Sequence, residues 1–377
     1  MYCKDYYFVV VRNTKYGDVA NKMSKTRYLR VNPSCPESYL IAQGAEVIKK
    51  GGLVAFPTET VYGLGADGLN MDAVLKVFQA KGRPRGNPLT LHVSSLDQAR
   101  KLVSSWPPTA ELLAKRFLPG PLTLILPRSE GIPDLVTAGL PNIGLRYPSN
   151  RIALELIKAS GVPLAAPSAN ISGCPSPTGA QHVLADLDGK IDLILDGGPT
   201  EVGMESTIIS LAGERPLLLR PGGVTKEEIE EVLKEEIAVA NSVLHPDKAS
   251  GEEESRCQGV NNKHYAPWAQ VIMVTGSPGE QVTKVKNFLA ANRGRKIGVL
   301  ATSEHFPIYE SFSVSPVYLT ALGSRTSPEE IASRLFSAFR ECDQAGAEMV
   351  LVETVAPTGM GLAVMNRLCR AAEQHQI

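Results

Sequence analysis

Three cations, Lys81, Arg83 and Arg85, stand within five positions of one another, and Asn87 adds a neutral donor in the same segment. The planar guanidinium of an arginine can contact two phosphate oxygens at once, and a lysine supplies a compact positive charge. Lys81 alone has an alternative role, in which it complements the dipole of a helix that ends there. The two arginines favour an anion, so this segment predicts a polyphosphate site.

Further polar side chains recur where predicted strands end. Most of them have a structural alternative when taken singly: a capping hydroxyl in a turn, a satisfied histidine or a plain surface loop. Arg146 differs, because a guanidinium in an apolar strand is costly to bury unless it meets an anion or a carboxylate. Since α/β sheets gather ligands at strand ends, we expect these residues to share a site. The candidates are Thr58, Thr60, His92, Arg146, Ser168, Asn170, Ser172, Ser176, Thr178, Ser206, Thr207 and Arg220.

Several common catalytic signatures are absent from the sequence. There is no GxxxxGK[ST] phosphate loop, no HExxH zinc motif, no GxSxG elbow and no kinase signature. The six cysteines are scattered without a CxxC pair, which indicates neither a zinc site nor a disulfide framework. Such cysteine usage fits a reducing cytosol, and no metal site built by the protein alone is predicted.

Length and charge narrow the class of protein. A chain of 377 residues is too long for one ordinary core, so we expect two domains. The formal net charge is zero, so affinity for nucleic acid would have to come from a local patch. No apolar run approaches the roughly 18–20 residues that span a bilayer, and the N-terminus lacks the features of a secretory signal. We expect a cytoplasmic protein without a membrane partner.

The elements that would position the candidates alternate short apolar runs with helical periodicity. Strands are predicted over 53–56, 89–93, 122–126, 143–146, 164–166, 191–195, 206–211 and 217–219, and helices over 37–50, 72–81, 109–117, 151–160 and 179–187. The excess of strands predicts an α/β domain with a mixed sheet, not a strict βαβ repeat. Gly82 and Pro84 predict that the second helix ends at Lys81.

The rest of the chain predicts an extension, a linker and a second domain. Residues 1–36 are interpreted as an N-terminal extension and 37–225 as the first domain. Residues 226–268 begin with an acidic helix and become polar with few core formers, which is typical of a linker or lid. Over 269–377 strands and helices alternate, which predicts a smaller parallel, Rossmann-like domain. Its first strand is not followed by GxGxxG, so no dinucleotide is inferred.

Six motifs in a fixed order resemble a known family. PTETVYGLG (57–65), Lys81-Gly82-Arg83, PGPLT (119–123), SANISG (168–173), SPT (176–178) and Ser206-Thr207 are similar to the signature of the YrdC-type threonylcarbamoyl-adenylate synthases. The resemblance covers essentially all of 37–225, and the appended domain resembles the long, two-domain form. It implies a YrdC-like twisted mixed sheet followed by a Rossmann-like domain.

The resemblance also implies a reaction and its residues. L-threonine, bicarbonate and ATP would give L-threonylcarbamoyl-AMP and pyrophosphate, a nucleotidyltransferase reaction with Mg²⁺ on the phosphates. A partner transferase would then pass the threonylcarbamoyl group to tRNA. The family's catalytic tetrad matches Lys81, Arg83, Ser168 and Asn170. Further ATP contacts match Asn87, Asn142, Ser176, Arg220 and Tyr265, and threonine contacts match Thr60, His92, Arg146 and Ser206.

The linker departs from the family's pattern. Where the family reads like PGMKYKHYAP, this chain keeps Gly259, His264 and Tyr265 but not the proline, the methionine, the first lysine or the first tyrosine. In the family this linker folds over the active site as a lid. We therefore expect His264 and Tyr265 to cover the site here, with weaker closure.

Two other functions fit parts of the sequence. A YrdC-like cleft can also bind duplex RNA in a non-catalytic ribosome-assembly module, but here the basic residues cluster at one loop instead of forming a stripe along a backbone. A carbamoyl-transfer enzyme of hydrogenase maturation contains a related module, yet it would carry CxxC zinc fingers and an acylphosphatase-like segment, which this sequence lacks. The synthase is the favoured interpretation.

Overall fold

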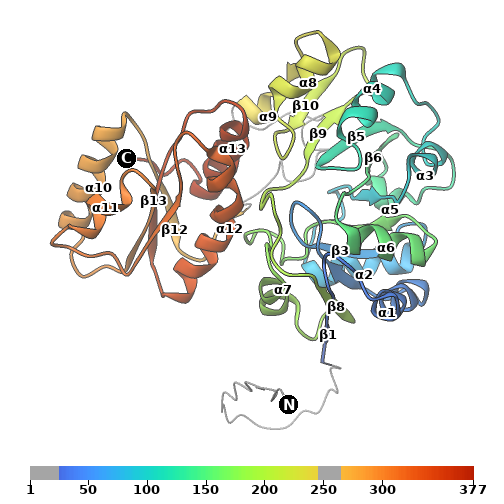
Figure 1. Cartoon of the computed structure of the whole chain (residues 1–377), viewed down its shortest axis with the longest axis horizontal. Helices are drawn as coiled ribbons and strands as arrows, with labels where there is room; N and C mark the ends of the chain where they lie inside the picture. Colours follow the sequence, from blue (N-terminus) through green and yellow to red (C-terminus); the bar gives the residue numbers. More distant parts are fainter. Residues whose placement is uncertain (1–24, 245–264) are drawn as a thin grey trace.

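Two β-sheets organise the residues that the computed structural model describes, 25–244 and 265–377 (Figure 1). The larger sheet contains, in spatial order, β1 (Arg27–Arg30), β8 (Leu193–Asp196), β2 (Val54–Phe56), β3 (Gly63–Asp67), β7 (Leu164–Ala165), β4 (Thr90–His92), β6 (Asn142–Arg146), β5 (Leu122–Pro127), β9 (Thr207–Ser210), β10 (Leu217–Arg220) and β11 (Ala238–Val239). The smaller sheet contains β12 (Gln270–Val274), β15 (Met349–Glu353), β13 (Ile297–Thr302) and β14 (Tyr318–Gly323).

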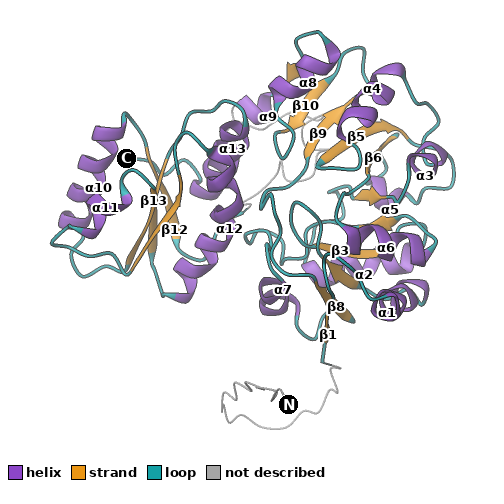
Figure 2. Cartoon of the chain, viewed as in Figure 1, coloured by secondary structure: helices purple, strands orange, loops and turns teal. Residues whose placement is uncertain are grey.

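The larger sheet is mixed, as the sequence predicts. Strand β4 is parallel to β6, whereas β5 is antiparallel to β6 and parallel to β9. Every strand and helix predicted over 37–225 overlaps an observed one, so the α/β fold class is confirmed (Figure 2). The helices of this part are α1 (Ser38–Lys49), α2 (Met71–Lys81), α3 (Leu96–Lys101), α4 (Pro108–Phe117), α5 (Asp134–Thr137), α6 (Arg151–Ser160), α7 (Ala180–Leu187), α8 (Lys226–Leu233) and α9 (Asn241–Leu244).

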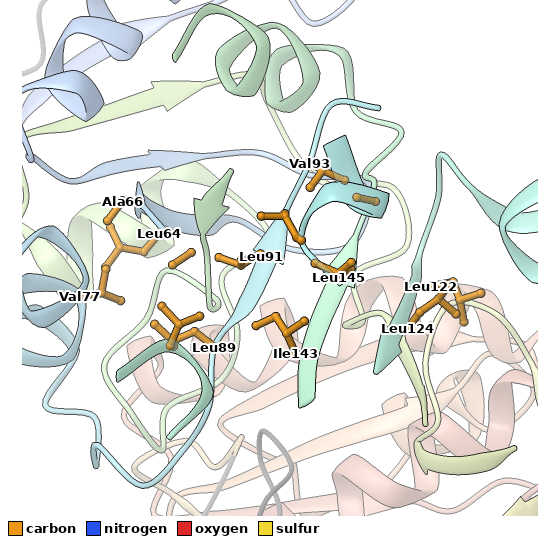
Figure 3. Packing of buried hydrophobic residues seen from close by; sticks show 14 of the residues in the cluster. Leu64, Ala66, Val77, Leu89, Leu91, Val93, Leu122, Leu124, Ile143 and Leu145 are labelled. Atoms are coloured by element: carbon orange, nitrogen blue, oxygen red, sulfur yellow. The ribbon is translucent and has the colours of Figure 1, made fainter. Parts of the chain in front are cut away.

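Alternation along the central strands separates a hydrophobic core from a polar face. Leu91 and Leu145 are register partners on β4 and β6, and both are buried in the cluster drawn in Figure 3. The next residues along the two strands, His92 and Arg146, are also partners, and Thr123 of β5 pairs with Arg146. Because successive side chains on a strand point to opposite faces, these three share the face away from that cluster. The sheet thus presents a row of polar groups.

Of the strands in the described residues, three were not predicted by the sequence: β1, β3 and β11. Strand β1 lies inside the predicted extension and pairs with β8. Strand β3 lies where the sequence suggests a turn, because glycines at both ends of its first three residues weaken the strand signal. Gly65 has a packing reason: a Cβ atom there would lie 2.7 Å from the Phe56 ring of the neighbouring strand β2. The glycine makes room for an aromatic ring, so the segment remains a strand.

Helix α2 delivers the first cation of the predicted site. The side chain of Asn70 caps its start by accepting hydrogen bonds from the backbone N–H groups of Asp72 and Ala73. Its end is set by Gly82, whose φ of 60° and ψ of 34° place it in the left-handed region. The predicted stop at Lys81 is confirmed, and the lysine side chain is buried.

The smaller sheet is entirely parallel, which confirms the Rossmann-like prediction. Its helices are α10 (Pro278–Ala291), α11 (Phe306–Glu310), α12 (Pro328–Gln344) and α13 (Met360–Ala372). Residues of α10 and α11 pack in one core cluster, and residues of α12 and α13 in another. Figure 1 shows α12 and α13 on the side of this sheet that faces the larger one.

The two parts of the molecule pack directly against each other. Val61 and Met204, both from loops of the larger part, belong to the core cluster of α12 and α13. Gly203 lies so close that a Cβ atom would be 2.5 Å from the Cα atom of Ser333. Within the predicted linker, residues up to 244 form α8, β11 and α9, and β11 joins the larger sheet. The limits at 36, 225 and 268 stay predictions.

None of the helices in the described residues combines the length and the apolar character that crossing a bilayer requires.

Gly65→Ala should lower the free energy of unfolding by roughly 1–3 kcal/mol, because the added methyl group overlaps the buried Phe56 ring. Urea unfolding followed by Trp106 fluorescence in a Trp268→Phe background would measure it in the larger part. Gly86→Ala is the matched control, because a Cβ atom at Gly86 meets nothing within 4 Å. Equal losses in both variants would contradict the packing role of Gly65.

Candidate active site

A cavity lies over the polar face of the larger sheet and collects most of the predicted site residues. The residues that line it come from the segment between β2 and β3, from the end of α2, from β4 and β6, from the loop after β7, from the loop before β9, from the end of β10 and from the chain entering β12. The predicted residues among them are Thr58, Lys81, Arg83, His92, Arg146, Ser168, Asn170, Ser172, Ser176, Ser206, Arg220 and Tyr265. Positions far apart in the sequence therefore share one cavity.

Lys81 joins the end of α2 to the loop after β7. Its Nζ donates hydrogen bonds to the carbonyl oxygens of Ser168 and Asn170, and its own carbonyl accepts from the backbone N–H of Ser172 at 2.9 Å. Burial, reinforced by the charge of Arg83, lowers the pKa of Lys81 to about 7. The lysine therefore changes its protonation near neutral pH unless an anion binds beside it.

Arg83 reaches the cavity while Arg85 does not. The Arg83 side chain is buried and donates to the carbonyl oxygens of Pro88, at 3.0 Å, and Asn87, at 3.4 Å. Burial lowers its pKa to about 10, so it stays charged at neutral pH. Arg85, two positions later, is exposed to solvent. Of the three clustered cations, two serve the cavity.

Arg146 meets the carboxylate that a buried arginine requires. Its Nη2 lies 2.8 Å from Oε1 of Glu59, and both side chains are about 95% buried. The same nitrogen donates to the hydroxyls of Thr60, at 2.9 Å, and Thr58, at 3.3 Å. Glu59 was not among the residues predicted from the sequence. It stands between the candidates Thr58 and Thr60, and the predicted burial of Arg146 required an anion or a carboxylate. Thr60 does not line the cavity but orients the arginine that does.

His92 lies beside Arg146 and stays neutral. Burial, with a further contribution from the charge of Arg146, lowers the pKa of His92 to about 3. Its Nδ1 is buried and has no hydrogen-bond partner within the described part of the chain. Farther along the row, the hydroxyls of Thr123 and Ser206 lie 2.8 Å apart. The row across the sheet offers a cation, a neutral imidazole and two hydroxyls.

The far wall of the cavity contains a second buried carboxylate that the sequence analysis did not select. Glu205 accepts a hydrogen bond from the hydroxyl of Ser176 and pairs with Arg367 of α13, with Nε 2.9 Å from Oε2. Next to it, the guanidinium of Arg220 donates to the carbonyl oxygen of Ser206 at 2.9 Å. Nothing in the local pattern of either segment marks this pairing, because Arg367 lies 162 positions from Glu205.

Tyr265 closes one side of the cavity, whereas His264 lies outside the described residues. The Tyr265 ring stacks on Phe336 of α12, with centroids 5.5 Å apart, and lines the cavity. Its φ of 67° is in the left-handed region, which bulky residues rarely adopt. The next residue, Ala266, donates its N–H to the carbonyl oxygen of Gly173 at 3.1 Å. The end of the linker is therefore attached to the loop after β7.

A second, more apolar cavity adjoins the first on the same face of the sheet. Thr90 lines both cavities, and Asn142, a predicted ATP contact, lines only the second. Its other walls are mainly aliphatic side chains of β5, β6, β9 and β10, including Ile125, Ile208 and Leu219. Asn87 lines neither cavity; it is buried in the same loop as Arg83, whose guanidinium donates to its carbonyl oxygen.

Comparisons with known proteins agree with this geometry. Residues 46–222 match a family described as Telomere recombination, and 224–373 match the threonylcarbamoyl-AMP synthase C-terminal domain. The chain is 46% identical to the threonylcarbamoyl-AMP synthase of Pyrococcus abyssi, over 89% of this chain and 95% of that protein. The chain belongs to the threonylcarbamoyl-AMP synthase family.

Other members of this family give the same picture. The Bacillus subtilis threonylcarbamoyl-AMP synthase is 44% identical over 88% of this chain and 92% of its own. The crystal structure of P. abyssi Sua5 complexed with L-threonine superposes with a TM-score of 0.86 at 44% identity, covering 93% of this chain and 99% of that one. The resemblance inferred from six motifs is confirmed.

No protein-built metal centre is found in residues 25–244 and 265–377. These ranges hold no group of three or more His, Cys, Asp or Glu side chains arranged to bind a metal ion. The two buried carboxylates nearest the cavity are both paired with arginines, Glu59 with Arg146 and Glu205 with Arg367. A Mg²⁺ ion would therefore have to depend mainly on ligands that a substrate brings.

Glu59→Ala should lower the free energy of unfolding of the larger part by roughly 3–5 kcal/mol, because it leaves the Arg146 guanidinium buried without its carboxylate. Urea unfolding followed by Trp106 fluorescence in the Trp268→Phe chain measures the loss. The control is Asp134→Ala, which breaks an ion pair with Arg128 of similar length, 2.7 Å, in which the aspartate is 77% exposed. A loss no greater than that of the control would refute the role of the buried pair.

Proposed function

We propose that this chain joins L-threonine, bicarbonate and ATP to form L-threonylcarbamoyl-AMP and pyrophosphate, as a nucleotidyltransferase. The observation that carries the proposal is the meeting of Lys81 and Arg83 with the Ser168 and Asn170 segment in one cavity. Family membership supports it, since relatives of nearly full length are threonylcarbamoyl-AMP synthases.

ATP is assigned to the two adjoining cavities. The phosphates would lie in the first, against the tetrad of Lys81, Arg83, Ser168 and Asn170. The adenine and ribose would extend along the sheet into the second cavity, whose aliphatic walls suit a nucleobase. The remaining contacts assigned to ATP are Asn87, Asn142, Ser176, Arg220 and Tyr265. Of these, Asn87 would act through the loop that it supports.

Threonine is assigned to the polar row on the sheet. The Nε of Arg146 is buried and lacks a hydrogen-bond partner among the described residues, which leaves it available to a carboxylate. Thr60 holds Arg146 in place, and Ser206 offers a hydroxyl. The neutral His92 would position the amino or carbamate group of the substrate without adding a charge. The crystal structure of the P. abyssi relative contains L-threonine, which supports a site for this amino acid.

The chemistry needs positioning and charge stabilisation more than a protein nucleophile. The neutral amine of threonine adds to CO₂, giving a carbamate and a proton, or condenses with bicarbonate, giving a carbamate and water. A carbamate oxygen then attacks the α-phosphorus of ATP, and the bond to the pyrophosphate leaving group breaks. Negative charge grows on the phosphate oxygens, so the preorganised Lys81 and Arg83 stabilise the transition state. Mg²⁺ would accompany the triphosphate.

The product would serve tRNA modification in the cytoplasm. A mixed anhydride of a carbamate and AMP is an activated acyl donor, so a partner transferase would take the threonylcarbamoyl group to tRNA. The RNA-binding alternative predicts solvent-facing cations along a groove. Lys81 and Arg83 are instead buried inside the cavity, which favours a small anionic ligand.

Pyrophosphate release from ATP should depend on both threonine and bicarbonate. Lys81→Ala or Arg83→Ala should reduce its rate by roughly 10²–10³-fold, because each removes a charge aimed at the phosphates. Arg85→Ala is the matched control and should retain activity, since Arg85 is exposed two positions away. Near-normal turnover by both cavity variants would refute the assignment, and RNA binding that ATP does not displace would favour the alternative.

Nucleotide affinity should decline as the pH rises above about 7. Below that value the buried Lys81 is protonated in the free protein, and a bound triphosphate favours the charged form, so binding above pH 7 must take up a proton. The dissociation constant of a non-hydrolysable ATP analogue should then rise by up to about tenfold per pH unit. The dissociation constants are measured by calorimetry for the unmodified chain and for Lys81→Met. The variant lacks the titrating lysine, so its pH profile gives the contribution from ionisation of the nucleotide itself. Parallel pH profiles for the two chains would disprove the titration of Lys81.

A further inference from the structure

The C-terminal domain reaches the candidate active site through one arginine. Arg367 of α13 is fully buried, and its side chain points out of its own domain. Its Nε donates to Glu205, and its Nη1 donates to the carbonyl oxygen of Pro221 at 2.9 Å. Its guanidinium also lies over the ring of Tyr265, 5.2 Å from the ring centroid. A single side chain thus contacts three segments that border the cavity.

Glu205 connects Arg367 to Ser176, which lines the cavity. One carboxylate oxygen of Glu205 takes the Arg367 hydrogen bond, and the other accepts from the hydroxyl of Ser176. The backbone carbonyl of Glu205 also accepts from the N–H of Gly223 at 3.2 Å. At Gly222 a Cβ atom would lie 2.2 Å from that carbonyl oxygen, so the loop before β9 and the loop after β10 lie in backbone contact. Displacing Glu205 would therefore disturb both of these loops.

A second arginine holds the same wall from α12. Arg340 makes a bidentate contact with Asp186, at 2.9 and 3.0 Å, and donates to the carbonyl oxygen of Pro175. Asp186 accepts in turn from the backbone N–H of Ile171, in the loop after β7. Helix α12 thus contacts the loop that carries Asn170 and Ser176 directly, and α13 reaches Ser176 through Glu205. In Figure 1 these two helices face the larger sheet.

We propose that Arg367 is a positioning residue of the synthase reaction, which rests on the function proposed above. Through Glu205 it fixes the hydroxyl of Ser176, and through Pro221 it fixes the strand end that carries Arg220. The C-terminal domain thereby completes the wall of the phosphate site and is required for nucleotide binding as well as for stability.

The negative charge of Glu205, which Arg367 pairs with, provides a way to test the role of Arg367. Burial opposes ionisation of Glu205, but the charges of Arg367 and Arg220 and the hydrogen bond from Ser176 together hold its pKa below the ordinary value. Glu205 is therefore a carboxylate on the wall of a cavity built for anions. Without Arg367 this negative charge would remain buried beside the phosphates and repel them.

Steady-state pyrophosphate release by the full-length chain tests the proposal. Arg367→Met should raise KM for ATP by roughly 10- to 100-fold. The double variant Arg367→Met with Glu205→Gln should recover most of the affinity for ATP, because it removes the uncompensated charge. Arg367→Lys should keep more activity than the methionine variant, since it retains a cation. A purely structural role of Arg367 predicts no such rescue.

The control is Arg295→Met, which breaks an exposed ion pair with Glu348 inside the C-terminal domain. It should leave KM for ATP unchanged. Normal KM in folded Arg367→Met and Arg367→Lys chains, or a double variant as impaired as the single one, would overturn the proposal. Failure of the proposed function would appear separately, as absence of threonine-dependent pyrophosphate release in the unmodified chain.

Discussion

Removing a lysine ammonium from water requires compensating dipoles, and the whole candidate site is arranged around one such compensation. Lys81 finds it in the carbonyl oxygens of Ser168 and Asn170, so the end of α2 and the loop after β7 are held together. The backbone contact between Ser172 and Lys81 strengthens the same junction. Without this junction, the loop that carries Arg83 and the loop that carries Ser168 and Asn170 would be separate features of the surface. Neither loop alone would bind a nucleotide selectively.

The balance of buried charge explains why the cavity suits an anion. Among the described residues, its lining contains four cations, Lys81, Arg83, Arg146 and Arg220, and one carboxylate, Glu205. The carboxylate is paired with an arginine that does not line the cavity, so it removes little positive potential from the ligand side. Burial disfavours the charged forms of Lys81, Arg83 and Arg220, and an incoming triphosphate would relieve this cost. The free energy stored in buried cations therefore contributes to nucleotide binding.

Local patterns predicted what depends on neighbours in the sequence. The stop of α2 at Gly82, the polar residue at the end of β4 and the need of Arg146 for a carboxylate could all be inferred from short segments. The identity of that carboxylate could not, because Glu59 meets Arg146 only when β2 and β6 join one sheet. Arg367 gave no signal at all, since its partner lies in another domain. Strand β3 was hidden by glycines that a neighbouring aromatic ring requires.

The C-terminal domain provides hydrophobic packing for the active-site loops that the larger sheet cannot provide. The part of the larger sheet around His92 and Arg146 must stay polar and open, so the loops above these residues cannot bury apolar side chains against it. Val61, Met204 and Tyr265 on those loops instead pack into the core of α12 and α13. The active-site loops thus pack their apolar side chains against the C-terminal domain, and the part of the sheet around His92 and Arg146 is left for substrates. The C-terminal domain then shapes the site through packing and through buried arginines.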